Sequence, residues 1–508
     1  MKNYRKLLIL FMITYAGFSQ HVKENQINSQ YQKLDTLFRK LNKLDLLNGN
    51  VLVAENNRIV YQNSFGYSDF STQKGNNENT LFCLASISKV ITSTAVLQLV
   101  EKRNIKLEDE LIKYLPRFPY PDITISQLLS HTSGLPDYQL FEKQIKDNPE
   151  KVLKISDLMS ALELWQKPLG QKPGEAWNYS NTNYMLLALL VEQVAKTTFE
   201  TYVRKNIFEP SNMKHTFFAT ETIKTENQAI NHEYPFLFSM ERQNVDSLKK
   251  YRWRTYNASG FVGQGNILST TTDLLKFDKA LYDGKLLSQA SLDEAFTPTR
   301  KLDGTYVNAF SSQGQASYGL GWFILDNKAD GRIVWHTGGQ PGALGIFLRN
   351  IDKHQTIVIF DNAFNKNIYK NGFDALNILN DKKVDFSKVS LVKQYASTIQ
   401  QSGIDAAFIQ LKQLQSETGS YYLDEDDMNE LGLQLLYAAA FQNHDLMALE
   451  ILKLNTIFFP DSFNTYDSYG EALAHLGKKQ EAITMYQKSI ELNPKNEGGK
   501  QALEELLK

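Results

Sequence analysis

The sequence has little cysteine and no excess of charge. Its single cysteine, Cys83, excludes a disulfide within the chain and is most simply a small buried apolar residue. The 55 Lys and Arg residues are balanced by 56 Asp and Glu residues, which leaves a formal net charge of −1. A chain balanced in this way has no general attraction to nucleic acid or to an anionic membrane.

Motifs for metals, nucleotides and nucleic acids are also missing. The sequence has no His-Glu-x-x-His pattern, and its eight His residues are scattered, so no set of metal ligands stands out. Residues 263–268, GQGNIL, lack the third glycine of a dinucleotide-binding loop. No basic patch interleaved with aromatic residues indicates a nucleic-acid surface. We therefore expect no cofactor, no metal ion and no nucleic-acid partner.

The apolar run near the N-terminus is too short for a membrane span. Residues 7–18 follow the basic residues Lys2, Arg5 and Lys6 and precede the small residue Ser19, which is typical of a secretory signal peptide. A bilayer-spanning helix needs about 20 apolar residues, so a retained signal anchor is the less favoured alternative. We expect residues 1–19 to be cleaved, a periplasmic or secreted location, and no stable membrane anchor.

Helical and β-rich patterns follow one another in the first three quarters of the chain. Residues 31–47 have helical apolar spacing, residues 49–69 predict a β-hairpin, and residues 82–103 predict a helix that is buried nearly all round. From residue 257 onward, β-rich runs joined by short polar turns indicate antiparallel strands. This order predicts an α+β domain over residues 28–378.

The last part of the chain, residues 389–508, shows only helical patterns, and these repeat. Ala448 and Pro460 lie 34 residues before Ala482 and Pro494, which is the tetratricopeptide period. We predict a tetratricopeptide-like domain, whose concave surface would suit a peptide or protein partner. Packing on the neighbouring domain is the alternative role. The residues that match the repeat pattern are Tyr466, Gly470, Gly477, Ala482, Tyr486 and Pro494.

Ser-x-x-Lys pairs, which can form a nucleophile and its base, differ mainly in their surroundings. Only Ser86 and Lys89 open a strongly apolar helix, where residues three apart share one face. A Ser at a helix start lies near free backbone N–H groups, and burial lowers the pKa of a Lys so that its neutral amine can take a proton. For this segment alone, an N-cap Ser and a surface Lys are the alternative. The other pairs are Ser71/Lys74, Ser211/Lys214, Ser247/Lys250 and Ser390/Lys393.

Two further segments favour chemistry over capping. Tyr179 and Asn181 lie in a polar loop just before another apolar helix, although Tyr-x-Asn occurs four times in the chain. Residues 336–339, HTGG, end a predicted strand, where glycines would let a substrate approach an N–H group that faces a developing oxyanion. Residues 131–134, HTSG, follow a predicted helix and precede a proline turn, so we expect a structural role for them.

Six segments occur in an order that resembles one known family. They are LASISKVITSTAVLQLVE, LLSHTSGLPDY, PGEAWNYSNTNYMLLALLVEQV, LSTTTDLLKFDKAL, SYGLGWFI and WHTGGQPGA. Together they resemble the penicillin-recognising serine hydrolases, which include class C β-lactamases, D-alanyl-D-alanine carboxypeptidases, D-aminopeptidases and related esterases. The resemblance covers residues 30–375. It implies a β-lactamase/transpeptidase-like fold, an antiparallel sheet flanked by helices plus a helical subdomain, with the active site between them.

The resemblance also implies roles for individual residues. Ser86 would be the nucleophile that forms an acyl-enzyme, and Lys89, alone or with Tyr179, would take its proton. Tyr179 would also pass the proton to the leaving amine. Asn181 would hold the amide side chain or carbonyl of the substrate. The backbone N–H groups of Ser86 and Gly339 would form the oxyanion hole.

His336 departs from the β-lactamase form of its motif, which begins with Lys. With Thr337 and Gly338, it would line the site opposite the leaving group; a strand-edge His without a substrate role is the alternative. A Lys is a permanent cation, whereas a His is only partly charged near neutral pH. The His form resembles DD-peptidases and D-amino-acid peptidases, which argues against β-lactam hydrolysis but not against acylation by a β-lactam.

The sequence therefore predicts a serine hydrolase that acts through an acyl-enzyme on amide bonds of small peptides with D-configured residues. Esters and, weakly, β-lactams are the alternative substrates within the same family. From a different class of function, the alternative is a non-catalytic sensor or binding protein that uses the helical tail. The intact motifs at Ser86, Tyr179 and His336 argue against that alternative.

Overall fold

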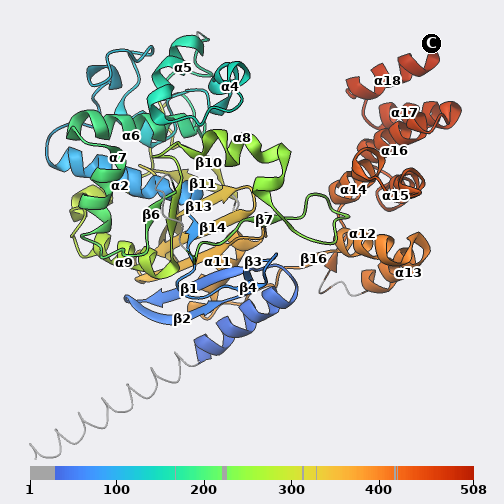
Figure 1. Ribbon diagram of the computed structural model, residues 1–508, viewed down its shortest axis with the longest axis horizontal. Coiled ribbons are helices and arrows are strands. Elements are labelled where there is room, and N and C mark those ends of the chain that lie inside the picture. Colours follow the sequence, from blue (N-terminus) through green and yellow to red (C-terminus); the bar gives the residue numbers. More distant parts are fainter. Residues whose placement is uncertain are drawn as a thin grey trace, which may run out of the picture. The chain divides into compact units, whose positions relative to one another are not determined.

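The computed structural model describes residues 29–165, 167–219, 226–311, 314–327, 329–416, 419 and 421–508 (Figure 1). The predicted signal peptide, residues 1–19, lies outside these ranges. Within them, every helix is too short or too polar to cross a membrane. The chain divides into two compact units: unit 1 holds the described residues up to Glu233 together with Asn244–Asp385, and unit 2 holds Tyr234–Gln243 and Phe386–Lys508.

Unit 1 is built on an antiparallel sheet whose eight described strands run in the order β10–β11–β12–β13–β14–β15–β1–β2. Six strands follow the chain, and the N-terminal hairpin closes onto them because β1 pairs with β15, Gly49 opposite Asp361. Asn56 and Asn57 turn that hairpin with left-handed φ angles of 51° and 61°, which Asn tolerates. The strands are β1 (Gly49–Glu55), β2 (Arg58–Ser64), β10 (Ala309–Ser311), β11 (Gly314–Tyr318), β12 (Phe323–Asn327), β13 (Gly331–Gln340), β14 (Ala343–Asn350) and β15 (Gln355–Asp361).

The sheet separates two hydrophobic layers, because successive side chains of a strand point to opposite faces. Leu52 and Ala54 of β1 belong to a core shared with the helices α2 and α6. Val51 and Val53 belong to a second core, shared with the helix of residues 29–43 and with α11. These helices are α2 (Ser88–Glu101), α6 (Asn181–Ala195) and α11 (Ile368–Leu379). The predicted α+β fold with helices flanking an antiparallel sheet is confirmed.

Helix α2 is buried on all sides, as its sequence predicts: every residue from Ser88 to Leu99 is buried. The helix begins later than residue 82, however. Phe82–Cys83 (β5) pair with Ile267–Ser269 (β9), and Ala85–Ile87 form a 3-10 turn ahead of α2. Ala85 has a φ of 43°, a left-handed conformation that is costly for a residue other than glycine. Ser86 therefore lies in a strained turn instead of the first turn of the helix.

The region between α2 and β9 contains most of the remaining helices of unit 1, which form the helical subdomain above the sheet in Figure 1. Short helices dominate there, because prolines and polar loops interrupt the apolar runs. They are α3 (Ile125–Leu129), α4 (Glu142–Asp147), α5 (Leu158–Trp165), α7 (Phe199–Val203) and α8 (Arg252–Thr255).

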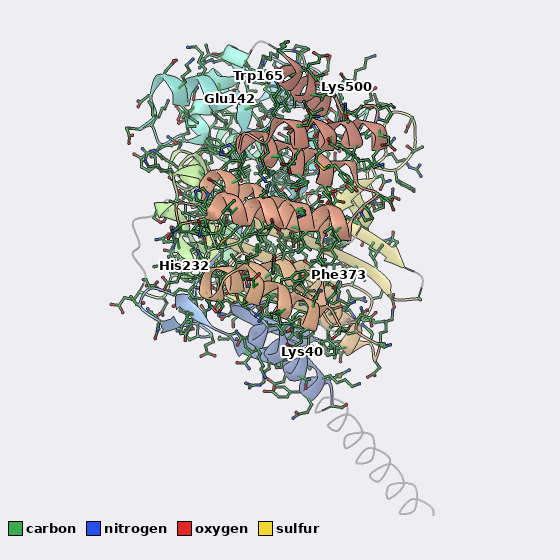
Figure 2. The ribbon with its side chains drawn as sticks, turned by 90° about the vertical axis from the view of Figure 1, so that its right-hand side faces the viewer. Lys40, Glu142, Trp165, His232, Phe373 and Lys500 are labelled. Atoms are coloured by element: carbon green, nitrogen blue, oxygen red, sulfur yellow. The ribbon has the colours of Figure 1, made fainter. Side chains whose placement is uncertain are left out.

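Unit 2 is helical, and its successive helices pack on one another. Small residues let α16 and α17 approach: a Cβ added at Gly470 would lie 3.3 Å from the Tyr486 ring, and Ala482 is fully buried. Lys500, labelled in Figure 2, pairs with Glu497 on α18. The tetratricopeptide assignment stays a prediction. The helices are α12 (Leu391–Ser402), α13 (Ile404–Gln415), α14 (Glu425–Ala438), α15 (His444–Phe458), α16 (Phe463–His475), α17 (Lys479–Leu492) and α18 (Glu497–Leu507).

Unit 2 also contains a short excursion of the chain from unit 1. Phe238 is 8% exposed and belongs to the unit 2 core, where its ring meets that of Phe441 with centroids 5.9 Å apart. The backbone N–H of Leu237 donates to Gln434 Oε1 at 2.7 Å. Sequence patterns did not indicate this excursion. Residues 234–242 form no helix or strand, so the segment has no periodicity that could be recognised.

Candidate active site

Lys89 lies at the centre of a buried polar cluster at the start of α2. Its side chain is fully buried, and Nζ lies 3.1 Å from Ser86 Oγ, 2.8 Å from Asn181 Oδ1 and 2.9 Å from the Gln264 carbonyl oxygen. The amide and carbonyl oxygens can only accept hydrogen bonds, so Nζ donates to both. A neutral amine has two N–H groups and one lone pair, so a neutral Lys89 that donates to both oxygens would keep its lone pair for the Ser86 hydroxyl.

The protonation of Lys89 follows from its burial. Removal from water lowers the pKa of Lys89 well below its usual value, and the positive charge of Arg254 acts in the same direction, while Asp137 opposes it. Burial raises the pKa of the Tyr179 phenol well above its usual value, and a hydrogen bond with Ser86 opposes that rise. The ring centre of Tyr179 lies 4.9 Å from Lys89 Nζ. The arrangement favours a neutral amine and a protonated phenol on either side of Ser86.

Asn181 is oriented by Asp137, a residue to which sequence patterns assigned no role. As the first residue of α6, Asn181 donates its backbone N–H to Asp137 Oδ1 at 2.9 Å and its amide Nδ2 to Oδ2 at 3.0 Å. The carboxylate thus occupies the N-terminus of α6, where a negative charge is favourable. Because the amide nitrogen is held by Asp137, Asn181 Oδ1 points to Lys89. The only sequence signal for Asp137 is its place in the segment LLSHTSGLPDY.

The Gln264 carbonyl is placed by the glycine on its N-terminal side. Gly263 has a φ of 88°, and a Cβ there would lie 2.3 Å from the Tyr184 carbonyl oxygen, so only glycine fits. Thr92, three residues after Lys89 on α2, donates to the Gly263 carbonyl at 2.6 Å. Lys89 and Thr92 therefore hold this backbone segment from one helix face. The pair of glycines around Gln264 was the available sequence signal.

The end of β13 approaches the turn that carries Ser86. β12 pairs with β13 only from Gly331 to Trp335, so within the described residues the remainder of β13 is open on that side. A Cβ added at Gly338 would lie 2.2 Å from the Leu84 carbonyl oxygen, which shows how close the two backbones come. Gly339 and Ser86 line the same small cavity, of about 20 Å³. The structure thus brings these two backbones, expected to supply the oxyanion hole, to one place.

His336 and Thr337 do not line that cavity in the described structure. His336 is 1% exposed; its Nδ1 lies 2.7 Å from the Thr337 carbonyl and its Nε2 lies 3.2 Å from Tyr318 Oη. A carbonyl can only accept, so Nδ1 carries the proton and Nε2 accepts from Tyr318. Burial lowers the pKa of His336 to about 3. The expectation that His336 is partly charged near neutral pH is therefore wrong.

Comparison with known proteins places this site in a family. The family model described as "Beta-lactamase" matches residues 34–371, more than half of the chain. The chain belongs to the beta-lactamase family. Penicillin-binding protein 4* of Bacillus subtilis (strain 168) is 34% identical over 333 residues, covering 65% of this chain and 71% of that protein. The putative penicillin-binding protein PbpX of the same strain is 30% identical over 346 residues, covering 67% and 77%.

Solved structures share the fold of this beta-lactamase-family protein. A penicillin binding protein from Bacillus halodurans aligns with a TM-score of 0.57 and 24% identity, covering 68% of this chain and 99% of that one. A D-amino acid amidase from Ochrobactrum anthropi SV3 aligns with a TM-score of 0.56 and 21% identity, covering 70% and 98%. The family is one of serine hydrolases, and the matched region ends before the helices of unit 2 begin.

Proposed function

We propose that this beta-lactamase-family protein hydrolyses amide bonds of small peptides with D-configured residues, through an acyl-enzyme on Ser86. The observation that carries the proposal is the fully buried Lys89, whose Nζ lies 3.1 Å from Ser86 Oγ and also contacts Asn181 Oδ1 and the Gln264 carbonyl oxygen. The His form of the 336–339 motif, which resembles that of D-peptidases, supports the choice of substrate. The names of the relatives, penicillin-binding proteins, support acylation by β-lactams.

In the acylation step, Ser86 Oγ bonds to the carbonyl carbon of the substrate while its proton moves to Lys89 Nζ. The carbonyl π electrons move to oxygen, and the N–H groups of Ser86 and Gly339 hold the resulting oxyanion. Lys89 is the preferred base because burial lowers its pKa and raises that of Tyr179. Asn181, which already contacts Lys89, would also hold the amide of the substrate.

In the second half of acylation, the C–N bond breaks and the leaving nitrogen takes the phenolic proton of Tyr179. Lys89 then passes the proton that it took from Ser86 to the Tyr179 oxygen. Water then attacks the ester on Ser86, losing its proton through the same pair of residues, and Ser86 Oγ is the leaving group. Each proton lost by a nucleophile is thus returned to a leaving group, and Ser86, Lys89 and Tyr179 end the cycle as they began it.

Labelling with a fluorescent penicillin tests the nucleophile. We expect the wild type to be labelled and Ser86→Ala to be unlabelled, while Lys89→Met should slow labelling by about 100- to 10,000-fold, because a positioned base contributes a factor of this size. Ser88→Ala is the matched control: Ser88 is buried two residues away and its Oγ has no hydrogen-bond partner among the described residues, so its loss should leave labelling unchanged. Equal labelling of Ser86→Ala and the wild type would refute the mechanism.

A hydrolysis screen tests the substrate class. D-amino-acid amides and peptides should be cleaved faster than matched L compounds, p-nitrophenyl esters and a chromogenic cephalosporin. Faster cleavage of esters would mean that the protein is an esterase that uses the same acyl-enzyme chemistry on Ser86. If Ser86→Ala kept the cellular role and deletion of residues 389–508 abolished it, the binding-protein alternative would be supported. Export of the chain and a partner for its helical tail stay predictions.

A further inference from the structure

A second and much larger cavity adjoins the one that contains Ser86. It has a volume of about 850 Å³, and it shares Arg254, Asn266 and Gln340 with the Ser86 cavity. The Ser86 cavity, at about 20 Å³, has room for little more than one water molecule. The larger cavity therefore offers space beside Ser86 into which part of a substrate can extend. Charged side chains of both signs line that cavity: Lys154, Arg204, Arg254, Glu200 and Asp246.

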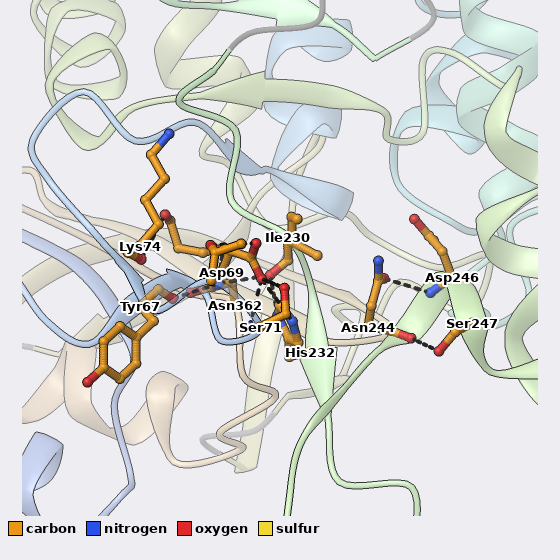
Figure 3. A network of polar contacts seen from close by, with 12 residues as sticks. Tyr67, Asp69, Ser71, Lys74, Ile230, His232, Asn244, Asp246, Ser247 and Asn362 are labelled. Atoms are coloured by element: carbon orange, nitrogen blue, oxygen red, sulfur yellow. Dashed lines mark hydrogen bonds and ion pairs between the residues drawn. The ribbon is translucent and has the colours of Figure 1, made fainter.

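Hydrogen bonds hold together one wall of the larger cavity. Asn231 and Asp246 line it, and the Val245 N–H donates to the Asn231 carbonyl at 3.0 Å, which ties the two sides of this wall together. Figure 3 shows how the wall is anchored: Asn362, which follows β15, donates to the Ile230 carbonyl at 2.9 Å and accepts from the His232 N–H at 2.9 Å. The same figure shows the Asp246 N–H donating to Asn244 Oδ1 at 3.0 Å.

Arg254 is the cation at the junction of the two cavities. It lies on the short helix α8, is half-buried, and its guanidinium lies 4.6 Å from the centre of the Tyr138 ring. None of the ion pairs between described residues includes Arg254. The nearby Asp137 carboxylate is already bonded to Asn181 through both oxygens. Of the residues that line the Ser86 cavity, Arg254 alone carries a full charge.

The order of residues along β13 indicates which half of the substrate meets this cation. Gly339 lies at the Ser86 cavity, Gln340 and Pro341 continue into the larger cavity, and His336 and Thr337 lie in the opposite direction along the strand. Gly339 lies between these two directions, so one half of a substrate at Ser86 follows β13 toward His336 and the other follows it toward Gln340. With the acyl half on the Gln340 side, its far end meets Arg254.

We propose that Arg254 binds a carboxylate on the acyl half of the substrate, so that the enzyme selects acyl groups with an acidic end. This inference rests on the proposed function, because it takes Ser86 as the site of acylation. A guanidinium is always charged and presents several donors to a carboxylate, and a half-buried position strengthens the interaction. The neutral His336 supplies no charge for this purpose, so specificity for an anion would come from α8 and not from β13.

Two amide substrates that differ only at the end of the acyl group test the inference. One carries an N-succinyl group, which ends in a carboxylate, and the other an N-succinamyl group, which ends in a neutral amide of the same size. We expect the wild type to prefer the succinyl compound by about 10- to 100-fold in kcat/KM, mainly through KM, because hydrogen bonds to charged groups have this strength. Arg254→Ala should lose the preference, and Arg254→Lys should keep part of it.

Arg252→Ala is the matched control, because Arg252 lies on the same helix but pairs with Glu150 and does not line either cavity. It should leave the preference unchanged. A preference that survives in Arg254→Ala, or its absence from the wild type, would overturn the inference.

Binding to an inactive protein separates the two proposals. In full-length Ser86→Ala, calorimetry should show the succinyl compound binding about 10- to 100-fold more tightly than the succinamyl compound, and the double variant Ser86→Ala/Arg254→Ala should bind both equally. If this difference is found but the wild type cleaves no amide or ester, the function fails and the anion site stands. Equal binding of both compounds to Ser86→Ala would refute the anion site.

Discussion

Two histidine–threonine segments, residues 131–134 and 336–339, meet around Tyr179. The ring centres of His131 and Tyr179 lie 4.3 Å apart, and those of His336 and Tyr179 lie 6.4 Å apart. Burial lowers the pKa of both histidines far below the usual value. Neither ring is therefore a cation at neutral pH, although one segment is a loop and the other a strand.

The two segments differ in what their backbones hold. Residue 131 belongs to a loop that supports the Tyr179 segment on both sides: Ser180 N–H donates to His131 Nδ1 at 3.2 Å, and Asn178 N–H donates to the His131 carbonyl at 2.8 Å. The strand segment instead brings Gly338 and Gly339 against the Ser86 turn. The loop positions a side chain, whereas the strand positions backbone N–H groups. The same pair of residue types thus serves two ends of one site.

The largest expected difference between the two segments, in kcat and in melting temperature, comes from substituting one glycine in each. Gly338→Ala places a Cβ 2.2 Å from the Leu84 carbonyl and must separate β13 from the Ser86 turn. Loss of one oxyanion donor lowers kcat by about 100- to 1,000-fold, and we expect a fall of this size. Gly134→Ala, at a φ of 76° and 2.3 Å from the Gln171 carbonyl, should mainly lower the melting temperature of the protein.

Both quantities should be measured for each glycine variant. The comparison predicts that Gly338→Ala loses far more kcat per degree of lost melting temperature than Gly134→Ala does. Parallel losses in the two variants would show that both segments act on activity only through the stability of the fold.

Replacing each histidine by leucine should have a smaller effect. His131→Leu leaves the Ser180 N–H without its acceptor next to Tyr179, and an unpaired buried donor costs about 1–3 kcal/mol. If Tyr179 moves to relieve this, kcat should fall roughly tenfold. His336→Leu removes the acceptor for Tyr318 and leaves the Ser180 contact intact, so its kcat should change less.

The conservative variant His131→Asn checks that prediction, because an amide oxygen can replace Nδ1 as the acceptor for Ser180. It should recover most of the kcat lost in His131→Leu, with KM unchanged in all three. No recovery, or a larger loss in His336→Leu, would reverse the roles of the two segments.

The fold, and the closeness of Ser86 to Lys89, could be predicted from local patterns in the sequence. The alternation in β1 and the dense apolar positions of α2 are properties of short segments, and each reflects which faces of the element are buried. Ser86 and Lys89 stand out from the other Ser-x-x-Lys pairs for the same reason. The start of α2 could not be predicted, because Phe82–Cys83 are drawn into β5 by pairing with β9, far along the chain.

The partners that tune the site could not be predicted, because they are joined only by the tertiary fold. Asp137 meets Asn181 across 44 residues, and the Gln264 carbonyl meets Lys89 across 175 residues. A backbone carbonyl has no residue type by which it could be recognised. The neutrality of His336 depends on burial and on Tyr318, neither of which appears in the motif HTGG.

The smallest expected effect concerns the stability of unit 1 below neutral pH. The folded pKa of His336 is lowered to about 3, so between pH 6.5 and pH 3 the unfolded chain binds a proton that the folded chain does not. Its contribution to stability is complete above pH 6.5 and is lost as the pH falls toward 3. From pH 7.5 to pH 6, the unfolding free energy of the wild type should therefore fall by about 1 kcal/mol more than that of His336→Gln.

Tryptophan fluorescence during urea unfolding measures this difference, because all five Trp residues of the chain lie in unit 1. The exposed His215 provides the matched control, and His215→Gln should keep the pH dependence of the wild type. Burial lowers the pKa of His131 as well, so half of the effect should remain in His336→Gln and disappear when His131→Asn is added. A pH dependence that survives both substitutions would mean that other groups, and not the two histidines beside Tyr179, make the acid-side loss of stability.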